Sequence, residues 1–430
     1  MKLKSLAFNV AAAVATFAAG SAMAAGFALQ NQNGAGTGYA YAGSAAVAED
    51  ASTIYFNPAG MLYLSEGHHI TGALTVLDRS LKFSDGGSSP LVVPVPNVGN
   101  FVYPGGTDGG DAGGISLVPA AYWAMSLNKD LRIGVGVSPT YGNATEWDDT
   151  FIGRYQGVYS EIEAININPS IAFRVNEIVA LGLGINYVKF DADLRGMQPV
   201  PTALPATVDV KSELSGDDAG WGWNAGAILQ FTPATRVALT YRSTIDLDVE
   251  GSVDAGPTSI PAKVSIELPD TASVAIAHQA TEKLQILADY TWTGWSSIPR
   301  LNVQHRTFGV TLTDEYLGFD DSYRIGLGMQ YQYTDVLRLR AGVAYDQSPV
   351  RNAADRTVRL PDSDRTWLAF GLNYKLNKQT SIDAGYAHLF FDKESIDRRT
   401  VLGTTPTTQF VKGTFDTSVN ILSVQLNHAF

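Results

Sequence analysis

The chain has 430 residues, of which 45% are hydrophobic, a formal net charge of −12 and no cysteine. The lack of cysteine excludes disulfides and thiolate metal sites, so packing and backbone hydrogen bonds must hold the fold together. The acidic charge argues against nucleic acid as a partner, because phosphate binding requires a basic surface.

The first 24 residues are predicted to be a cleaved signal peptide. Lys2 and Lys4 form a basic n-region, residues 6–19 an apolar h-region, and residues 22–24 a small-residue cleavage signal, Ala-Met-Ala. The apolar run is shorter than the roughly 20 residues that a membrane-spanning helix requires. The mature chain is therefore expected to begin at Ala25.

Residues 25–66 are rich in glycine and alanine and are too polar to anchor the chain in a membrane. They precede a long series of alternating strands, which predict a closed barrel with a lumen that needs filling. We therefore predict three parts: the signal peptide (1–24), an N-terminal hatch or plug inside the lumen (25–66), and a transmembrane β-barrel (67–430).

Apolar residues alternate with small or polar ones through the rest of the chain. In residues 323–333 the odd positions carry Tyr, Ile, Leu and Met, and the even positions Arg, Gly and Gln. This period of two is typical of β-strands with one apolar face, although soluble β-sandwiches show it as well. Fourteen such strands are predicted, near residues 69–77, 115–127, 131–142, 158–176, 178–196, 220–232, 235–253, 261–281, 284–304, 321–334, 336–350, 366–377, 380–398 and 417–430.

The third of these strands contains a proline, Pro139, in the sequence VGVSPTYG. Proline cannot donate to a strand ladder, so residues 138–142 should bulge or leave the sheet. Two interpretations stay open: the break is a side door in the barrel wall, or Pro139 merely ends the strand at the outer rim.

The connections between the strands point to a membrane barrel. Every second junction is a tight turn, at residues 128–130, 176–177, 233–234, 281–283, 334–335 and 377–379, and the others are longer. Short periplasmic turns that alternate with long outer loops are typical of outer-membrane barrels. We predict an all-β fold, a 14-stranded antiparallel barrel in the outer membrane of a Gram-negative cell, in contact with outer-membrane lipid and lipopolysaccharide.

The last strand ends in the sequence ILSVQLNHAF, whose alternation lets it close the barrel against the first strand. Aromatic residues near strand ends are expected to form girdles at the two membrane surfaces, with ordinary packing as the alternative. They are Tyr122, Trp123, Trp221, Trp223, Trp292, Trp295 and Trp367.

Motifs for catalysis or cofactor binding are largely lacking. The Gly-x-Gly pairs at 134–136, 182–184 and 326–328 lie inside strands and never extend to a phosphate loop. The six histidines form no H-E-x-x-H motif, and there is no G-x-S-x-G elbow. We therefore assign no catalytic residue, metal or cofactor. An outer-membrane lipase stays open only if a serine and a histidine meet in the fold, and the acidic run at 105–114 lacks the spacing of a calcium loop.

An ordered series of motifs resembles the FadL/TodX (OMPP1) family of outer-membrane transporters for long-chain fatty acids and other hydrophobic compounds. The series begins with Ala-Gly-Phe after the leader and Asn-Pro-Ala at 57–59. It continues with TYGNATEWDD (140–149), GWGWNAG (220–226), ALTYRS (238–243), YRIGLG (323–328) and LPDSDRTW (360–367), and it spans the mature chain.

The resemblance implies a monomeric barrel that takes up its ligand passively. An outer groove and an inner pocket would bind the ligand, rearrangement of the hatch would release it, and a kink in the third strand would let it leave sideways. The resemblance implies that Phe27 and Arg195 bind the ligand. The remaining implied residues are Asn57, Pro58 and Ala59 in the hatch, and Tyr141 and Gly142 beside Pro139 at the kink.

The substrate stays open between two kinds of molecule. Arg195 matches a family arginine placed to meet a fatty-acid carboxylate, but Asp320 stands in a segment where the fatty-acid transporters carry a lysine. An aromatic or aliphatic hydrocarbon is therefore the alternative to a long-chain fatty acid. A general water-filled porin is the alternative from another class.

Overall fold

The computed structural model describes residues 26–95, 99–201 and 207–430. The predicted signal peptide and Ala25 lie outside the described residues. No helix in the described part of the chain is long and apolar enough to cross a membrane.

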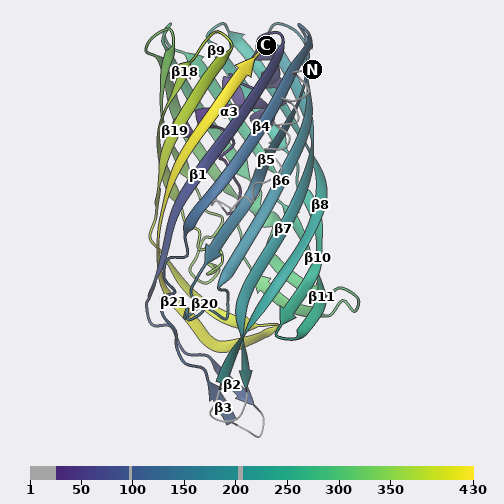
Figure 1. The fold of residues 1–430 in the computed structure, drawn as a ribbon, viewed down its shortest axis with the longest axis vertical. Helices are drawn as coiled ribbons and strands as arrows, with labels where there is room; N and C mark the ends of the chain where they lie inside the picture. The colour runs from purple at the N-terminus through teal and green to yellow at the C-terminus, as the bar shows by residue number, and fades with distance from the viewer. Residues whose placement is uncertain (1–25, 96–98, 202–206) are drawn as a thin grey trace, which may run out of the picture.

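The described strands form one closed antiparallel barrel, because β1 pairs with both β4 and β21 (Figure 1). The sheet has 19 strands within the described ranges, and five of its spans are each interrupted into two strands: β9 with β10, β11 with β12, β13 with β14, β15 with β16, and β19 with β20. The barrel therefore has 14 spans, which confirms the predicted fold class.

The bounds of the strands are as follows. They are β1 (His68–Asp85), β4 (Gly114–Asn128), β5 (Leu131–Glu146), β6 (Tyr159–Arg174), β7 (Val179–Pro201), β8 (Thr207–Thr232), β9 (Thr235–Arg242), β10 (Ile245–Ala255), β11 (Thr258–Leu268), β12 (Thr271–Gln279), β13 (Leu284–Thr293), β14 (Arg300–His305), β15 (Thr311–Tyr316), β16 (Ser322–Gln332), β17 (Leu337–Asp346), β18 (Arg365–Lys375), β19 (Thr380–Phe391), β20 (Glu394–Leu402) and β21 (Thr405–Ala429).

The tight turns gather at the end of the barrel where the chain finishes, the upper end in Figure 1. Two of them are built alike: Asn176 accepts hydrogen bonds from the backbone N–H groups of Ile178 and Val179, and Asn377 accepts those of Gln379 and Thr380. Asparagine makes such turns because its side chain reaches the backbone two or three residues on. The predicted turn positions are confirmed.

The opposite end carries long loops and strand extensions. Residues 78–114, which join the first two predicted strands, contain the end of β1 and a separate hairpin of β2 (Val92–Val95) and β3 (Gly99–Val102), which extends beyond the barrel (Figure 1). β7 and β8 continue as a long paired ribbon at the same end. The loops between barrel strands at this end therefore have folded structure of their own.

The faces of the strands follow the predicted alternation. Leu181, Leu183 and Ile185 of β7 are exposed on the outer face, whereas Gly182 and Gly184 between them are buried. Because hydrocarbon cannot hydrogen-bond, an apolar outer face and a small or polar inner face suit a membrane barrel.

Three residues of the predicted aromatic girdles do not lie on the outer face. Trp221 and Trp223 are exposed, but Tyr122, Trp295 and Trp367 are buried inside the barrel. Trp367 has the inward phase of β18, and Trp295 lies on the short helix η2 (Trp295–Ser297), where its span is interrupted. The girdle prediction is wrong for these three residues, because nearness to a strand end does not fix the face.

The N-terminal segment, residues 26–64, lies against the inner wall of the barrel. It forms four short helices: α2 (Gly34–Gly38), α3 (Ser44–Val47), α4 (Thr53–Phe56) and η1 (Pro58–Tyr63). α2 contacts β18, β19 and β21, α3 contacts β9 and β12, and η1 contacts β6, β7 and β8. The segment therefore contacts the wall on several sides of the lumen.

Small residues on the inner wall make room for the N-terminal segment. A Cβ on Gly182 would lie 2.2 Å from the backbone nitrogen of Ala59, and one on Gly342 2.3 Å from the backbone of Tyr39. Contacts this close exclude any side chain at these positions. Among the Gly-x-Gly pairs inside strands, Gly134, Gly182, Gly326 and Gly328 pack against residues 26–64, whereas Gly184 packs against other residues of the wall.

Candidate ligand pocket and wall opening

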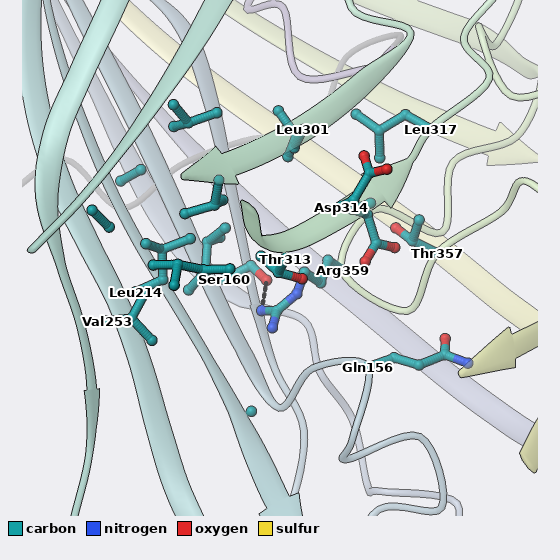
Figure 2. A pocket seen from close by; sticks show the side chains of 18 of the residues that line it. Gln156, Ser160, Leu214, Val253, Leu301, Thr313, Asp314, Leu317, Thr357 and Arg359 are labelled. Atoms are coloured by element: carbon teal, nitrogen blue, oxygen red, sulfur yellow. Dashed lines mark hydrogen bonds between the residues drawn. The ribbon is translucent and has the colours of Figure 1, made fainter. Parts of the chain in front are cut away.

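A cavity of about 440 Å³ lies between the barrel wall and the loops at the end opposite the tight turns. This volume is in the range of small-molecule sites. Most of its lining is apolar, including Ile162, Phe190, Leu214, Val249, Val264 and Leu301. Figure 2 shows residues from several strands and loops around it. Such a lining favours a ligand with a long apolar part.

Phe27 of the N-terminal segment lines this pocket and is 7% exposed. Its ring lies 4.9 Å from that of Trp295 and 5.7 Å from that of Tyr141, measured between centroids, and Trp295 packs edge-on against Phe319. The backbone N–H of Gly26, beside it, donates to the carboxylate of Asp362 at 2.9 Å. One boundary of the pocket is thus part of the segment that fills the lumen.

β5 carries a bulge where the sequence predicts one. Its register with β6 shifts between Pro139 and Tyr141, so Thr140 is the extra residue. The strand nevertheless continues to Glu146. The predicted bulge is confirmed, and the interpretation in which Pro139 ends the strand is wrong. The interpretation of the break as a side door stays a prediction.

The bulge opens the ladder between β4 and β5. The two strands pair from Asn128 and Leu131 as far as Ala121 and Val137, and no further among the described residues. Beyond that point β5 pairs inward instead: Leu29 N–H donates to Thr140 O at 2.8 Å, and Gly142 N–H to Phe27 O at 2.7 Å. The wall therefore lacks one ladder directly beside the start of the N-terminal segment.

A smaller cavity of about 100 Å³ lies further inside the lumen. Arg242, Asp289 and Arg324 line it together with several threonines. Burying charged groups against an alkyl chain is unfavourable. This inner part of the lumen therefore suits an apolar ligand less well than the pocket at the loop end does.

Asn57, Pro58 and Ala59 lie away from the pocket. Asn57 is fully buried: its Oδ1 accepts from Ala59 N–H at 3.1 Å, and its Nδ2 donates to the carbonyls of Ala45 (3.1 Å) and Ala227 (3.2 Å). Pro58 follows as the first residue of η1, where a missing N–H costs nothing. This triplet joins two parts of the N-terminal segment to the wall at β8.

Replacing Asn57 with alanine should lower the free energy of unfolding by about 2–3 kcal/mol, because a helix cap and two buried hydrogen bonds are lost. Thermal unfolding of the solubilised barrel measures this. Asn31→Ala is the matched control, since Asn31 is equally buried but its side-chain amide has no hydrogen-bond partner among the described residues. Equal losses in the two variants would contradict the assigned role.

Arg195 does not line the pocket. Its neighbours Leu194 and Gly196 do, so alternation along β7 places Arg195 on the other face. It pairs with Asp193 at 2.5 Å and, at 3.3 Å, with Glu213 of β8, which itself lines the pocket. The basic residues that line the pocket are Lys263, Arg359, Arg398 and Arg399.

Arg359, which lines the pocket, and Trp295, which packs against the pocket residues Phe27 and Phe319, were not predicted from the sequence to lie at this site. Arg359 immediately precedes the LPDSDRTW motif, and Trp295 was assigned to the membrane surface. Arg359 lies in the long loop between β17 and β18, a region without periodicity, so no local pattern points to its direction. A charged residue beside a conspicuous loop motif was the one available signal.

Comparison with known proteins gives a consistent result. Residues 15–430 match the family model described as "Outer membrane protein transport protein (OMPP1/FadL/TodX)". The chain is 32% identical to outer membrane protein P1 of Haemophilus influenzae, covering 96% of this chain and 97% of that protein. It is 30% identical to the long-chain fatty acid transport protein of Salmonella typhi, covering 86% and 88%.

Among solved structures, a Pseudomonas aeruginosa FadL homologue superposes with a TM-score of 0.85 at 22% sequence identity. The match covers 94% of this chain and 100% of that one. At this identity the likeness supports the fold, including the barrel and the arrangement of its strands.

Proposed function

The chain belongs to the OMPP1/FadL/TodX family of outer-membrane transport proteins, and from this premise we propose that it takes up long-chain fatty acids or similar hydrophobic molecules passively. It is a β-barrel of the Gram-negative outer membrane, and its relatives are named as outer-membrane and transport proteins, not as enzymes. The observation that carries the proposal is an apolar pocket beside an unpaired stretch of barrel wall.

In the proposed route the ligand enters the pocket from the loop end of the barrel. Residues 26–29 of the N-terminal segment, which act as a hatch, then shift away from Tyr141 and Gly142. The ligand leaves between β4 and β5, through the gap at Pro139, into the membrane. The inward hydrogen bonds from Leu29 to Thr140 and from Gly142 to Phe27 support this, because they couple the hatch to the edge of the gap.

The energetics explain why a movable boundary is needed. Burying an alkyl chain of about 15 methylenes contributes on the order of 12 kcal/mol, from about 0.8 kcal/mol for each methylene. A pocket that bound its ligand so tightly would release it slowly. Moving Phe27 would expose part of the bound chain and weaken the site, without an external energy source.

Purified protein is expected to bind oleate, and proteoliposomes that contain it to transfer oleate across the bilayer. Ion conductance should be small, because in the proposed function residues 26–64, which contact the wall on several sides, act as a plug. Fluorescence titration and single-channel recording measure the two properties. A general porin would instead show large conductance and no oleate binding, and that result would contradict the proposal. We expect a functional monomer, which light scattering of the solubilised protein tests.

A further inference from the structure

Arg359 is held in a fixed place at the pocket. Its carbonyl accepts hydrogen bonds from Asn143 Nδ2 at 3.0 Å and Thr145 Oγ1 at 3.3 Å, both on β5 beyond the bulge. Its Nη1 donates to Tyr159 O at 2.7 Å and Ser160 Oγ at 3.0 Å. Figure 2 shows the guanidinium turned toward Ser160 at the pocket wall. Backbone and side chain are therefore both anchored.

The guanidinium of Arg359 has unused donors. Among the described residues its side-chain hydrogen bonds come from Nη1 alone, so Nη2 and Nε are left. Two glycines leave space around it: a Cβ on Gly157 would lie 2.7 Å from Cζ, and one on Gly196 3.5 Å from Nη2. Two adjacent N–H groups of a guanidinium match the two oxygens of a carboxylate.

Arg359 has no carboxylate within 4.0 Å in the described part of the chain. The carboxylates nearby are already in ion pairs with other arginines. Burial lowers its pKa, while the more distant Glu315 and Asp193 raise it. Each of these two carboxylates already pairs with another arginine, Glu315 with Arg398 at 2.7 Å and Asp193 with Arg195.

The other charged residues that line the pocket are either in ion pairs or exposed to solvent. Asp314 pairs with Arg300 at 3.4 Å, and Glu213 pairs with Arg195. The cations Lys263 and Arg399 are exposed to solvent. Arg359 is thus a half-buried cation, without a counter-ion in the described residues, at the edge of an apolar cavity.

We propose that Arg359 binds the carboxylate of the transported molecule, whose alkyl chain occupies the apolar pocket. This rests on the proposed function and narrows it: the substrates are long-chain carboxylic acids, and uncharged hydrocarbons bind more weakly. An anionic head group compensates the half-buried guanidinium, and charge-assisted hydrogen bonds are stronger than those between neutral groups. Arg195, engaged with two carboxylates on the other face of β7, does not take this part.

The test compares two ligands with the same chain, oleate and oleyl alcohol, at a pH where oleate is ionised. Their affinities are measured by fluorescence titration for the wild-type protein and for Arg359→Gln, Arg359→Lys and Arg195→Gln. Wild type should bind oleate about tenfold or more tightly than the alcohol. Arg359→Gln should lose that preference while its affinity for the alcohol is unchanged, Arg359→Lys should keep part of it, and Arg195→Gln should keep it in full.

The alcohol also serves as the folding control, because a variant that binds it normally has an intact pocket. A preference for oleate that survives in Arg359→Gln, or is lost in Arg195→Gln, overturns the inference. Equal binding of both ligands by wild type also overturns it, but leaves the proposed function standing. If wild type binds neither ligand, both the proposed function and the inference fail.

Discussion

Removing the bulge from β5 is expected to reduce oleate uptake to background while oleate binding persists. The variant lacks Thr140 and carries Pro139→Val. Deleting the extra residue brings β5 back into continuous register with β6, and valine supplies the N–H that proline lacks. β5 can then pair with β4 beyond Val137, which closes the proposed exit in the wall.

Uptake by proteoliposomes and equilibrium binding of oleate are measured on the same preparations. Pro169→Val is the matched control, because Pro169 lies within β6 where the register with β5 and β7 stays the same on both sides. That variant should transport like wild type. Uptake that is unchanged after the bulge is removed would contradict lateral release, whatever the binding result.

The sequence predicts well the features that short stretches of chain determine. Alternation and asparagine turns such as those at Asn176 and Asn377 depend on neighbouring residues, so spans and turns were located correctly. Pro139 belongs with them, since a missing N–H disturbs the ladder wherever the strand lies.

The pocket depends on residues that are far apart in the chain, and there the sequence is less informative. Arg195 and Arg359 are both arginines near glycines, and only the folded barrel shows that the first is used in ion pairs on the other face of β7 while the second lines the pocket. Likewise Trp295 looks like a surface aromatic until its interrupted span turns it toward Phe27. Which side chains meet is set by strand register and loop course, which no single segment contains.

A buried ionic cluster ties the N-terminal segment to the barrel wall. Arg340 of β17 has a side chain that is 1% exposed, and it pairs with Glu49 of the segment at 3.0 Å and with Asp383 of β19. Arg338 adds a second bond to Glu49 at 2.8 Å. Asp50, next in the segment, accepts a hydrogen bond from Gln425 of β21. Two strands, β17 and β21, thus hold one short stretch of the segment by charge and hydrogen bonds, and β19 joins the cluster through Arg340.

Arg340→Met is expected to destabilise the protein by about 3–5 kcal/mol, because it leaves the buried carboxylate of Asp383 without a cation and that of Glu49 with Arg338 alone. Repulsion should detach the segment from this side of the wall, so that ion conductance in planar bilayers rises well above that of wild type. Thermal unfolding and single-channel recording measure the two effects.

Two further variants test whether the effect comes from charge or from packing. The first is a control at an exposed ion pair outside the cluster, and the second changes Glu49 inside it. Lys393→Met breaks an ion pair whose side chains are 76% and 66% exposed, and should change neither stability nor conductance measurably. Adding Glu49→Gln to Arg340→Met removes one of the two buried carboxylates that shared Arg340, and so should restore part of the stability and lower the conductance again. If the single and double variants conduct equally, loss of packing and not of charge has loosened the segment. Wild-type conductance in Arg340→Met would mean that the contacts of α3 and η1 suffice to keep the lumen closed.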